Sequence, residues 1–226
     1  MRPRIAFLTG QSDPTRCALS PQQSALLAEL AADAKGIDCI ALNYPWRSDS
    51  EDWRPVPMWR ASFANARQYL TARRGVEAAL PAAREWLLRA PRSLLLVGSC
   101  GLSLLEAMLG DADDAAYARL RVVAYGAVGP RWPRALQGHA LRGRFDWIAR
   151  ALGPAGLLPS GVSQQLLDCG HMDYLQRPQS RAAVLAAARA QLGWLRGEPC
   201  GRQACSDDIA DETRATSRTH AAEHGA

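Results

Sequence analysis

The part of the sequence best suited to covalent chemistry is a tight run of small residues, Gly98-Ser99-Cys100-Gly101. It follows the aliphatic run 94–97 and precedes an apolar, helix-like stretch that begins at Leu102. This pattern predicts a strand, a sharp turn and a helix, with a hydroxyl or a thiol held at the bend. The start of the helix would supply backbone N–H groups and a positive dipole for a developing oxyanion. Close packing alone also explains such a turn, so a chemical role requires partner residues elsewhere in the chain.

Two later residues are suitable partners. Asp146 follows a short apolar segment at 140–144, and His171 follows another at 164–167. The carboxyl ends of parallel strands meet at one edge of a sheet, where open α/β sheets bind ligands. A hydrolytic triad needs a nucleophile, an imidazole that takes its proton and a carboxylate that orients the imidazole. The order of Ser99 or Cys100, then Asp146, then His171 therefore predicts a triad at this edge.

The elements that must position these residues alternate between strand and helix. Short apolar strands are expected at 4–9, 37–42, 94–97, 120–127, 140–144 and 164–167. Helices are expected at 20–34, over most of 58–89 with breaks near Gly75 and Pro81, at 102–109 and at 181–195. Uniformly apolar strands that alternate with helices are typical of a mainly parallel sheet covered on both faces. We therefore predict a three-layer α/β fold with a mainly parallel central sheet.

Taken together, these motifs resemble the α/β-hydrolase superfamily over about 4–195. Segment 8–11, Leu-Thr-Gly-Gln, resembles the strand and oxyanion loop that open the family's core, and 95–101 resembles its nucleophile elbow. Segment 141–146 resembles the part that carries the acid, and Gly170-His171 resembles the His loop. The family's leading antiparallel strands have no counterpart before Arg4. The resemblance is therefore to a small, trimmed member of the thioesterase or carboxylesterase type.

This resemblance implies hydrolysis of an acyl ester or thioester through a covalent acyl-enzyme. Ser99 or Cys100 would attack, His171 would act as general base and then general acid, and Asp146 would orient His171. The oxyanion would be bound by a backbone N–H of Gln11 or Ser12 and by the N–H that follows the nucleophile, which belongs to Cys100 or Gly101. The substrate would be a small acyl compound, either free or tethered to a carrier protein. The resemblance implies no organic cofactor and no metal.

The elbow departs from the family pattern, in which a small residue stands two positions before and two positions after the nucleophile. Ser99 as nucleophile places Val97 upstream and Gly101 downstream, whereas Cys100 places Gly98 upstream and Leu102 downstream. We favour Ser99, because a Leu in this crowded position is the more serious departure. Cys100 stays open, because a thiol paired with a His is the better nucleophile at neutral pH.

Two other functions remain open because of this irregular elbow. One is a non-catalytic binding or scaffold protein that retains the fold. The other is an acyltransferase or cyclase that acts on a carrier-tethered acyl chain. Four aromatic residues between the second strand and the long helical stretch are candidates to line a substrate pocket, although ordinary packing explains them equally well: Trp46, Trp53, Trp59 and Phe63.

The charge distribution, the cysteine spacing and the length of the apolar runs argue against several classes of function. The net charge is +5, but the 27 Lys and Arg residues are spread along the chain rather than clustered, which argues against nucleic-acid binding. The six Cys residues include no Cys-x-x-Cys pair, so we expect no structural zinc site. No apolar run reaches the ~18 residues of a membrane span, and no signal peptide is recognisable, so a cytoplasmic location is expected. We divide the chain into a hydrolase-like domain, 1–197, and a polar tail, 198–226, that is expected to be disordered.

Overall fold

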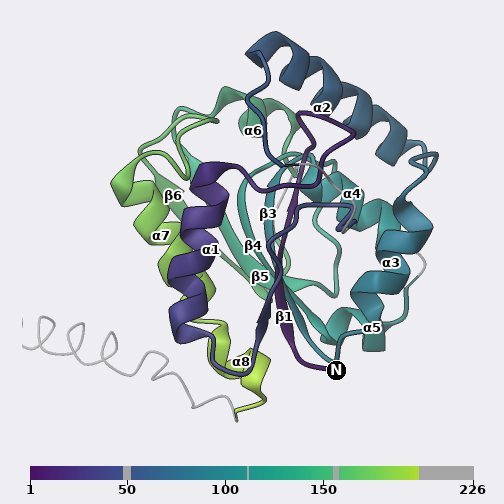
Figure 1. The fold of residues 1–226 in the computed structure, drawn as a ribbon, viewed down its shortest axis with the longest axis vertical. Helices are drawn as coiled ribbons and strands as arrows, with labels where there is room; N and C mark the ends of the chain where they lie inside the picture. Colours follow the sequence, from purple (N-terminus) through teal and green to yellow (C-terminus); the bar gives the residue numbers. More distant parts are fainter. Residues whose placement is uncertain (48–51, 111, 155–157, 199–226) are drawn as a thin grey trace, which may run out of the picture.

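The structure is a computed structural model that describes residues 1–47, 52–110, 112–154 and 158–198 (Figure 1). Its centre is a six-stranded sheet in the order β2-β1-β3-β4-β5-β6, and every strand pairing in it is parallel. The strands are β1 (Arg4–Thr9), β2 (Asp38–Cys39), β3 (Ser93–Ser99), β4 (Leu120–Ala127), β5 (Gln137–Gly143) and β6 (Val162–Leu167). The predicted α/β fold with a parallel central sheet is confirmed.

Helices cover both faces of the sheet, which gives the three predicted layers (Figure 1). One layer contains α1 (Pro21–Asp33), α7 (Pro178–Arg189) and α8 (Leu192–Arg196). The opposite layer contains α2 (Met58–Arg73), α3 (Leu80–Leu88), α4 (Gly101–Leu109) and α5 (Asp114–Ala118). A further short helix, α6 (Trp147–Leu152), joins β5 to β6. Strand β1 serves both layers, because Ile5 and Phe7 pack in the α1/α7 core and Ala6 and Leu8 in the α3/α4 core.

Several local signals in the sequence determine where these elements begin and end. Helix α1 begins with a capping box, in which the Ser20 side chain accepts from the Gln23 N–H and the Gln23 side chain accepts from the Ser20 N–H. The expected break near Gly75 separates α2 from α3, and Gly75 has a φ of +67°, a conformation that favours glycine. Strand β4 has the predicted bounds.

The second strand is shorter than the predicted 37–42. Strand β2 ends at Cys39, and Leu42 forms an isolated antiparallel bridge with Ala18 instead. The reason is that loop 11–19 lies at the end of β1 and offers its own backbone partners, since the Asn43 N–H donates to the Cys17 carbonyl at 2.6 Å. The short helix α5, in the acidic segment near Asp113, was not predicted. The Asp113 side chain caps this helix by accepting a hydrogen bond from the Ala116 N–H at 2.8 Å.

The polar tail from residue 199 onward lies outside the described residues, so the division at 197/198 stays a prediction. Among the helices that the structure describes, none has the length and apolar character needed to cross a membrane.

Candidate active site

The elbow forms as a sharp turn between β3 and α4. Ser99 is the last residue of β3, and its φ is +49°, in the left-handed region that few non-glycine residues adopt. Holding a serine in such a conformation costs about 1–3 kcal/mol, and strain of this kind is concentrated at functional sites. The Ser99 carbonyl accepts a hydrogen bond from the Val128 N–H at 2.7 Å, which ties the bend to the chain after β4. The Ser99 side chain is half-buried.

The close approach expected behind an elbow occurs at Gly101. A Cβ added at Gly101 would lie 1.9 Å from the Leu8 carbonyl oxygen and 3.2 Å from Val97 Cγ1. Helix α4 therefore passes too close to β1 for any side chain at this position. Gly101 stands two residues after Ser99, so the crowded downstream position matches the register in which Ser99 is the nucleophile.

Cys100 occupies a different environment from its neighbour. It is 2% exposed, and its thiol donates to the Gln68 side-chain oxygen at 3.5 Å. Burial raises the pKa of the Cys100 thiol to about 12. The thiol is therefore protonated at neutral pH, which is a poor state for a nucleophile.

Asp146 and His171, which are 25 residues apart in the sequence, meet at the carboxyl edge of the sheet. The His171 Nδ1 atom lies 3.0 Å from both carboxylate oxygens of Asp146. The Asp146 carboxylate also accepts from the Ala149 N–H at 2.9 Å and from the Tyr174 hydroxyl at 2.9 Å. Asp146 therefore caps α6 and binds His171 at the same time.

The environment of Asp146 favours its ionised form. Burial raises the pKa of this carboxyl, but the hydrogen bonds from His171, Ala149 and Tyr174 together outweigh burial and hold the pKa below its usual value. The Tyr174 hydroxyl is itself fixed, because it accepts from the Gly143 N–H at 2.6 Å. Tyr174 approaches closely enough that the chain needs a glycine at 126, where a Cβ would lie 2.5 Å from the tyrosine ring.

The loop that carries His171 is shaped by a second carboxylate. Asp173 accepts from the Gly170 N–H at 2.9 Å and forms an ion pair with Arg177 at 3.1 Å. Asp168, on the other side of His171, forms an ion pair with Arg144 at 3.0 Å. Of these three carboxylates, Asp146 is the one that contacts the His171 ring.

Ser99 lies on the same edge as this pair but is separated from it by β4. In the sheet Ser99 is paired with Ala127, and a Cβ on the adjacent Gly126 would lie 3.1 Å from Asp146 Oδ2. Within the described residues, no hydrogen bond joins Ser99 to His171. Catalytic hydrogen bonds are often long in the absence of substrate and shorten when it binds. The structure thus brings Asp146 and His171 into contact and places Ser99 one strand away.

The predicted oxyanion donors have unequal surroundings. The Gln11 N–H donates to the Gln68 side-chain oxygen at 2.9 Å, and the Gln68 amide donates in turn to the Gln11 side-chain oxygen at 3.1 Å. Gln68 is buried and belongs to α2, so it already fills the acceptor position in front of this N–H. Ser12 is exposed, and Gly101 lies in the buried first turn of α4.

A scan against protein-family models finds no match, and neither does a search of curated proteins. Solved structures do show a distant likeness. The type II thioesterase BorB from the borrelidin biosynthetic cluster is 16% identical with a TM-score of 0.44, and the match covers 84% of this chain and 91% of BorB. A putative α/β-superfamily hydrolase from Xanthomonas campestris is 16% identical with a TM-score of 0.42, and the match covers 87% of this chain and 98% of that protein. A sugar hydrolase (YeeB) from Lactococcus lactis is 14% identical with a TM-score of 0.42, and the match covers 87% of this chain and 89% of YeeB.

The parallel sheet carries a strained turn after β3, a carboxylate after β5 and a His after β6, in the chain order that the resemblance implied. The three-layer α/β architecture with a parallel central sheet agrees with the fold class that the sequence resemblance implied. The activities named for the three solved structures belong to those proteins.

None of the four aromatic candidates lines either of the two cavities described below. Trp46 is buried in the core, where its indole N–H donates to the Phe7 carbonyl at 2.9 Å and its ring stacks on Trp86 at 4.3 Å. The prediction that Trp46 lines a substrate pocket is therefore wrong. Trp59 and Phe63 are exposed, because α2 turns the side that carries Gln68 toward Gln11, in the loop after β1. Trp53 is exposed as well.

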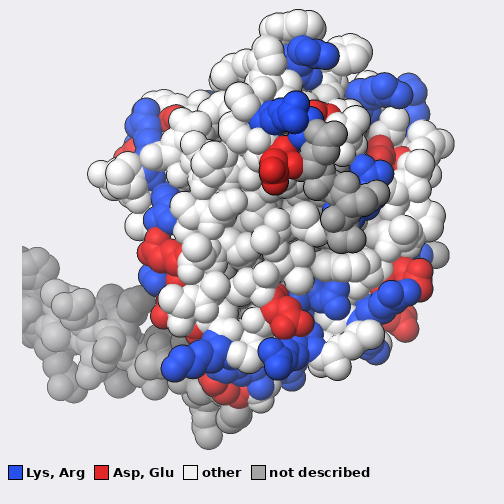
Figure 2. Space-filling model, in the orientation of Figure 1, with Lys and Arg blue, Asp and Glu red and all other residues white. Residues whose placement is uncertain are grey.

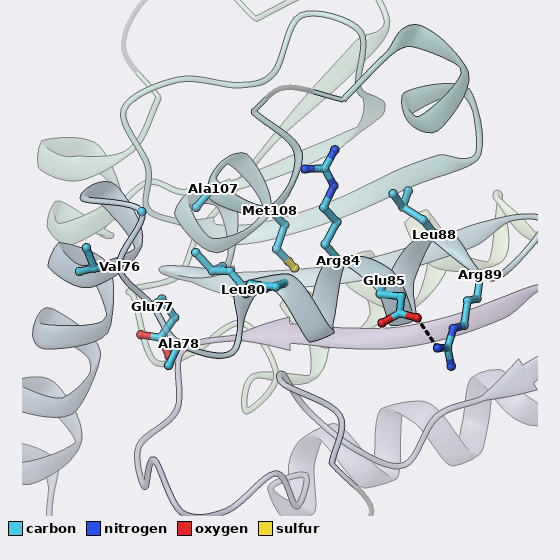
Figure 3. Close-up of a pocket in the computed structure, with 12 residues that line it drawn as sticks. Val76, Glu77, Ala78, Leu80, Arg84, Glu85, Leu88, Arg89, Ala107 and Met108 are labelled. Atoms are coloured by element: carbon cyan, nitrogen blue, oxygen red, sulfur yellow. Dashed lines mark hydrogen bonds and ion pairs between the residues drawn. The ribbon is translucent and has the colours of Figure 1, made fainter.

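Two of the cavities in the described part of the chain differ in their relation to the site, because Asp146 lines the smaller one and not the larger one. The larger one, about 840 Å³, lies between α3 and α4 and contains none of the predicted catalytic residues (Figure 3). The smaller one, about 300 Å³, is lined by Asp146, by Ala127, which pairs with Ser99, and by three arginines, Arg142, Arg144 and Arg150. The smaller cavity is the better candidate of the two for a substrate-binding region, because Asp146 and the strand partner of Ser99 line it.

Gln68 and Tyr174 are the site residues that sequence reasoning missed. Tyr174 is three residues from His171, and a polar aromatic residue so close to the His loop was a usable signal. No comparable signal marked Gln68, which is 57 residues from its partner Gln11. In the parts of the chain that the structure covers, no group of three or more His, Cys, Asp or Glu side chains could hold a metal ion.

Proposed function

We propose that this protein hydrolyses an acyl ester or thioester through a covalent acyl-enzyme on Ser99. The observation that carries the proposal is the buried Asp146 carboxylate, with both oxygens 3.0 Å from Nδ1 of His171, at the sheet edge where β3 bends at Ser99. A buried carboxylate bound to an imidazole, at the same sheet edge as a strained, half-exposed serine, provides the three groups that nucleophilic acyl transfer requires.

Ser99 is the better nucleophile of the two candidates. Its φ of +49° places the strained bend at the serine itself, and Gly101 leaves room for α4 in the matching register. Cys100 points into the core, and its raised pKa removes the chemical advantage that a thiolate would have.

His171 is suited to act as the general base. The ionised Asp146 accepts a hydrogen bond from the Nδ1–H group of His171, which leaves the lone pair on Nε2 free to take the Ser99 proton. The Ser99 oxygen then forms a bond to the acyl carbon, and the bond to the alcohol or thiol leaving group breaks as that group takes the proton from His171. Water, activated by the same imidazole, hydrolyses the acyl-Ser99 ester and restores the hydroxyl.

The oxyanion would be stabilised by backbone N–H groups at the start of α4 and after β1. The N–H of Cys100 stands next to Ser99, and the Gln11 N–H is now bound to Gln68. A substrate oxyanion that used the Gln11 N–H would have to replace the Gln68 side-chain oxygen.

Burst kinetics with p-nitrophenyl acetate test this proposal. We expect wild type and Cys100→Ala to release p-nitrophenol in a burst equal to the enzyme concentration when deacylation is slower than acylation, and otherwise in steady turnover. Ser99→Ala and His171→Ala should show neither the burst nor the steady turnover. Absence of burst and turnover in folded wild-type protein would favour the non-catalytic binding protein, and activity that survives in Ser99→Ala but not in Cys100→Ala would assign the thiol.

A further inference from the structure

Helix α2 turns its large apolar side chains away from the protein. Trp59 is 74% exposed, Phe63 is 70% exposed and Leu70 is 48% exposed. The buried residues of this helix are Gln68 and Ala72, one polar and one small. A surface helix normally buries its apolar stripe and exposes its polar side, so α2 has the reverse arrangement.

The two sides of α2 are well separated. At 3.6 residues per turn, Trp59, Phe63 and Leu70 point within about 40° of one another, and Ala66 falls in the same stripe. Gln68 points about 180° from Trp59 by the same geometry. The exposed aromatic stripe is therefore a raised ridge, and the opposite side of the helix is anchored by the hydrogen bonds of Gln68 to Gln11.

The charges along this ridge all have one sign. Helix α2 contains Arg60, Arg67 and Arg73 and no Asp or Glu. The Arg60 guanidinium lies 5.9 Å from the centre of the Trp59 ring, so charge and apolar surface are adjacent. Figure 2 shows arginine surface, in blue, beside uncharged surface over α2 at the top of the view. A partner of this ridge must therefore offer both apolar contact and negative charge.

We propose that α2 binds an anionic phospholipid surface, with Trp59, Phe63 and Leu70 entering the boundary between headgroups and acyl chains. Arg60 and Arg67, on one flank of the ridge, would bind lipid phosphates. Helices with Trp, Phe and Leu on one side and arginines beside them lie in membrane interfaces in this way. A convex ridge one helix wide fits a deformable lipid surface better than the surface of an acidic protein, which would have to supply a matching groove. Lipid binding through α2 is independent of whether Ser99 is acylated.

Vesicle co-sedimentation of the full chain tests this proposal, with phosphatidylcholine vesicles and with vesicles that also contain phosphatidylglycerol. We expect wild type to sediment with the anionic vesicles and to be released by salt. Trp59→Ala/Phe63→Ala should lower the partition coefficient at least about tenfold. Arg60→Gln/Arg67→Gln should lower it roughly 30-fold on anionic vesicles only, at about one kcal/mol for each arginine. The matched control is Trp147→Ala, which removes an exposed tryptophan from α6 and should bind like wild type.

Three results would overturn the proposal. One is failure of wild type to bind either kind of vesicle, and another is unchanged binding of Trp59→Ala/Phe63→Ala. The third is binding to soluble poly-glutamate without binding to vesicles, which would assign the ridge to an acidic polypeptide instead. All the substituted residues are exposed, and circular dichroism of each variant would establish that the fold is retained.

Discussion

The contact between α4 and β1 at Gly101 makes a strong prediction about the elbow. In Gly101→Ala the new methyl group would lie 1.9 Å from the Leu8 carbonyl oxygen, whereas real Cβ atoms essentially never approach another heavy atom closer than 3.0 Å. Helix α4 would have to move away from β1 by more than 1 Å. The neighbour is backbone in a buried strand, so no flexible side chain can move to relieve the clash.

The cost of this substitution follows from that geometry. Overpacking a well-filled core costs about 1–3 kcal/mol, and a clash with backbone belongs at the upper end of this range. For a chain of about 150–250 residues, 1 kcal/mol corresponds to about 2–4 °C in Tm. A loss of about 3 kcal/mol should therefore lower the Tm of Gly101→Ala by about 6–12 °C.

Thermal unfolding followed by circular dichroism measures this effect. Gly110→Ala, at the other end of α4, is the matched control, because its Cβ would lie 3.3 Å from the nearest oxygen and the residue is exposed. We expect the control to unfold within a few degrees of wild type. Equal Tm values for the two variants would refute the close approach at Gly101 and, with it, the Ser99 register of the elbow.

Three further predictions concern the residues around the site. Tyr174→Phe removes a donor to the buried Asp146 and the acceptor of the Gly143 N–H, so urea denaturation should show a loss of about 1–3 kcal/mol, and unchanged stability would contradict this. Gln68→Ala frees the Gln11 N–H for an oxyanion, so acylation by p-nitrophenyl acetate should be about 2- to 10-fold faster, and slower acylation would show that Gln68 supports the reaction instead. The lowered pKa of Asp146 stabilises the fold above about pH 4, and this stabilisation is lost as the pH falls through the folded-state pKa. The stability difference between wild type and Asp146→Asn should therefore be smaller at pH 3 than at pH 7, and equal differences would exclude this role of the carboxylate.

Much of the site was predictable because local rules act there without competition. Apolar runs bounded by turns place β1, β3 and β4 in the sheet, and residues that follow parallel strands must share one edge. Asp146 and His171 could thus be paired from their positions after two predicted strands. The small residues around Ser99 located the elbow, although they left the choice between Ser99 and Cys100 open. Burial of Cys100 and the positive φ of Ser99 favour the serine.

Other features depend on contacts between distant segments, which periodicity does not reveal. Trp59 and Phe63 were candidates to line a pocket, but the hydrogen bonds of Gln68 to Gln11 hold the opposite side of α2 against the loop after β1. Trp46 was placed in the same pocket, yet it stacks on Trp86, which is 40 residues further along the chain. The end of β2 was set too late because the alternative partner of Leu42 is Ala18, in a loop.

The most direct measurement of the central claim is intact-mass analysis of the protein after reaction with a fluorophosphonate, followed by peptide mapping. The account predicts one adduct per chain, located on Ser99, lost in Ser99→Ala and His171→Ala and retained in Cys100→Ala. No adduct on folded wild-type protein, or an adduct that persists in Ser99→Ala, would contradict the assignment of Ser99 as the nucleophile of an acyl hydrolase.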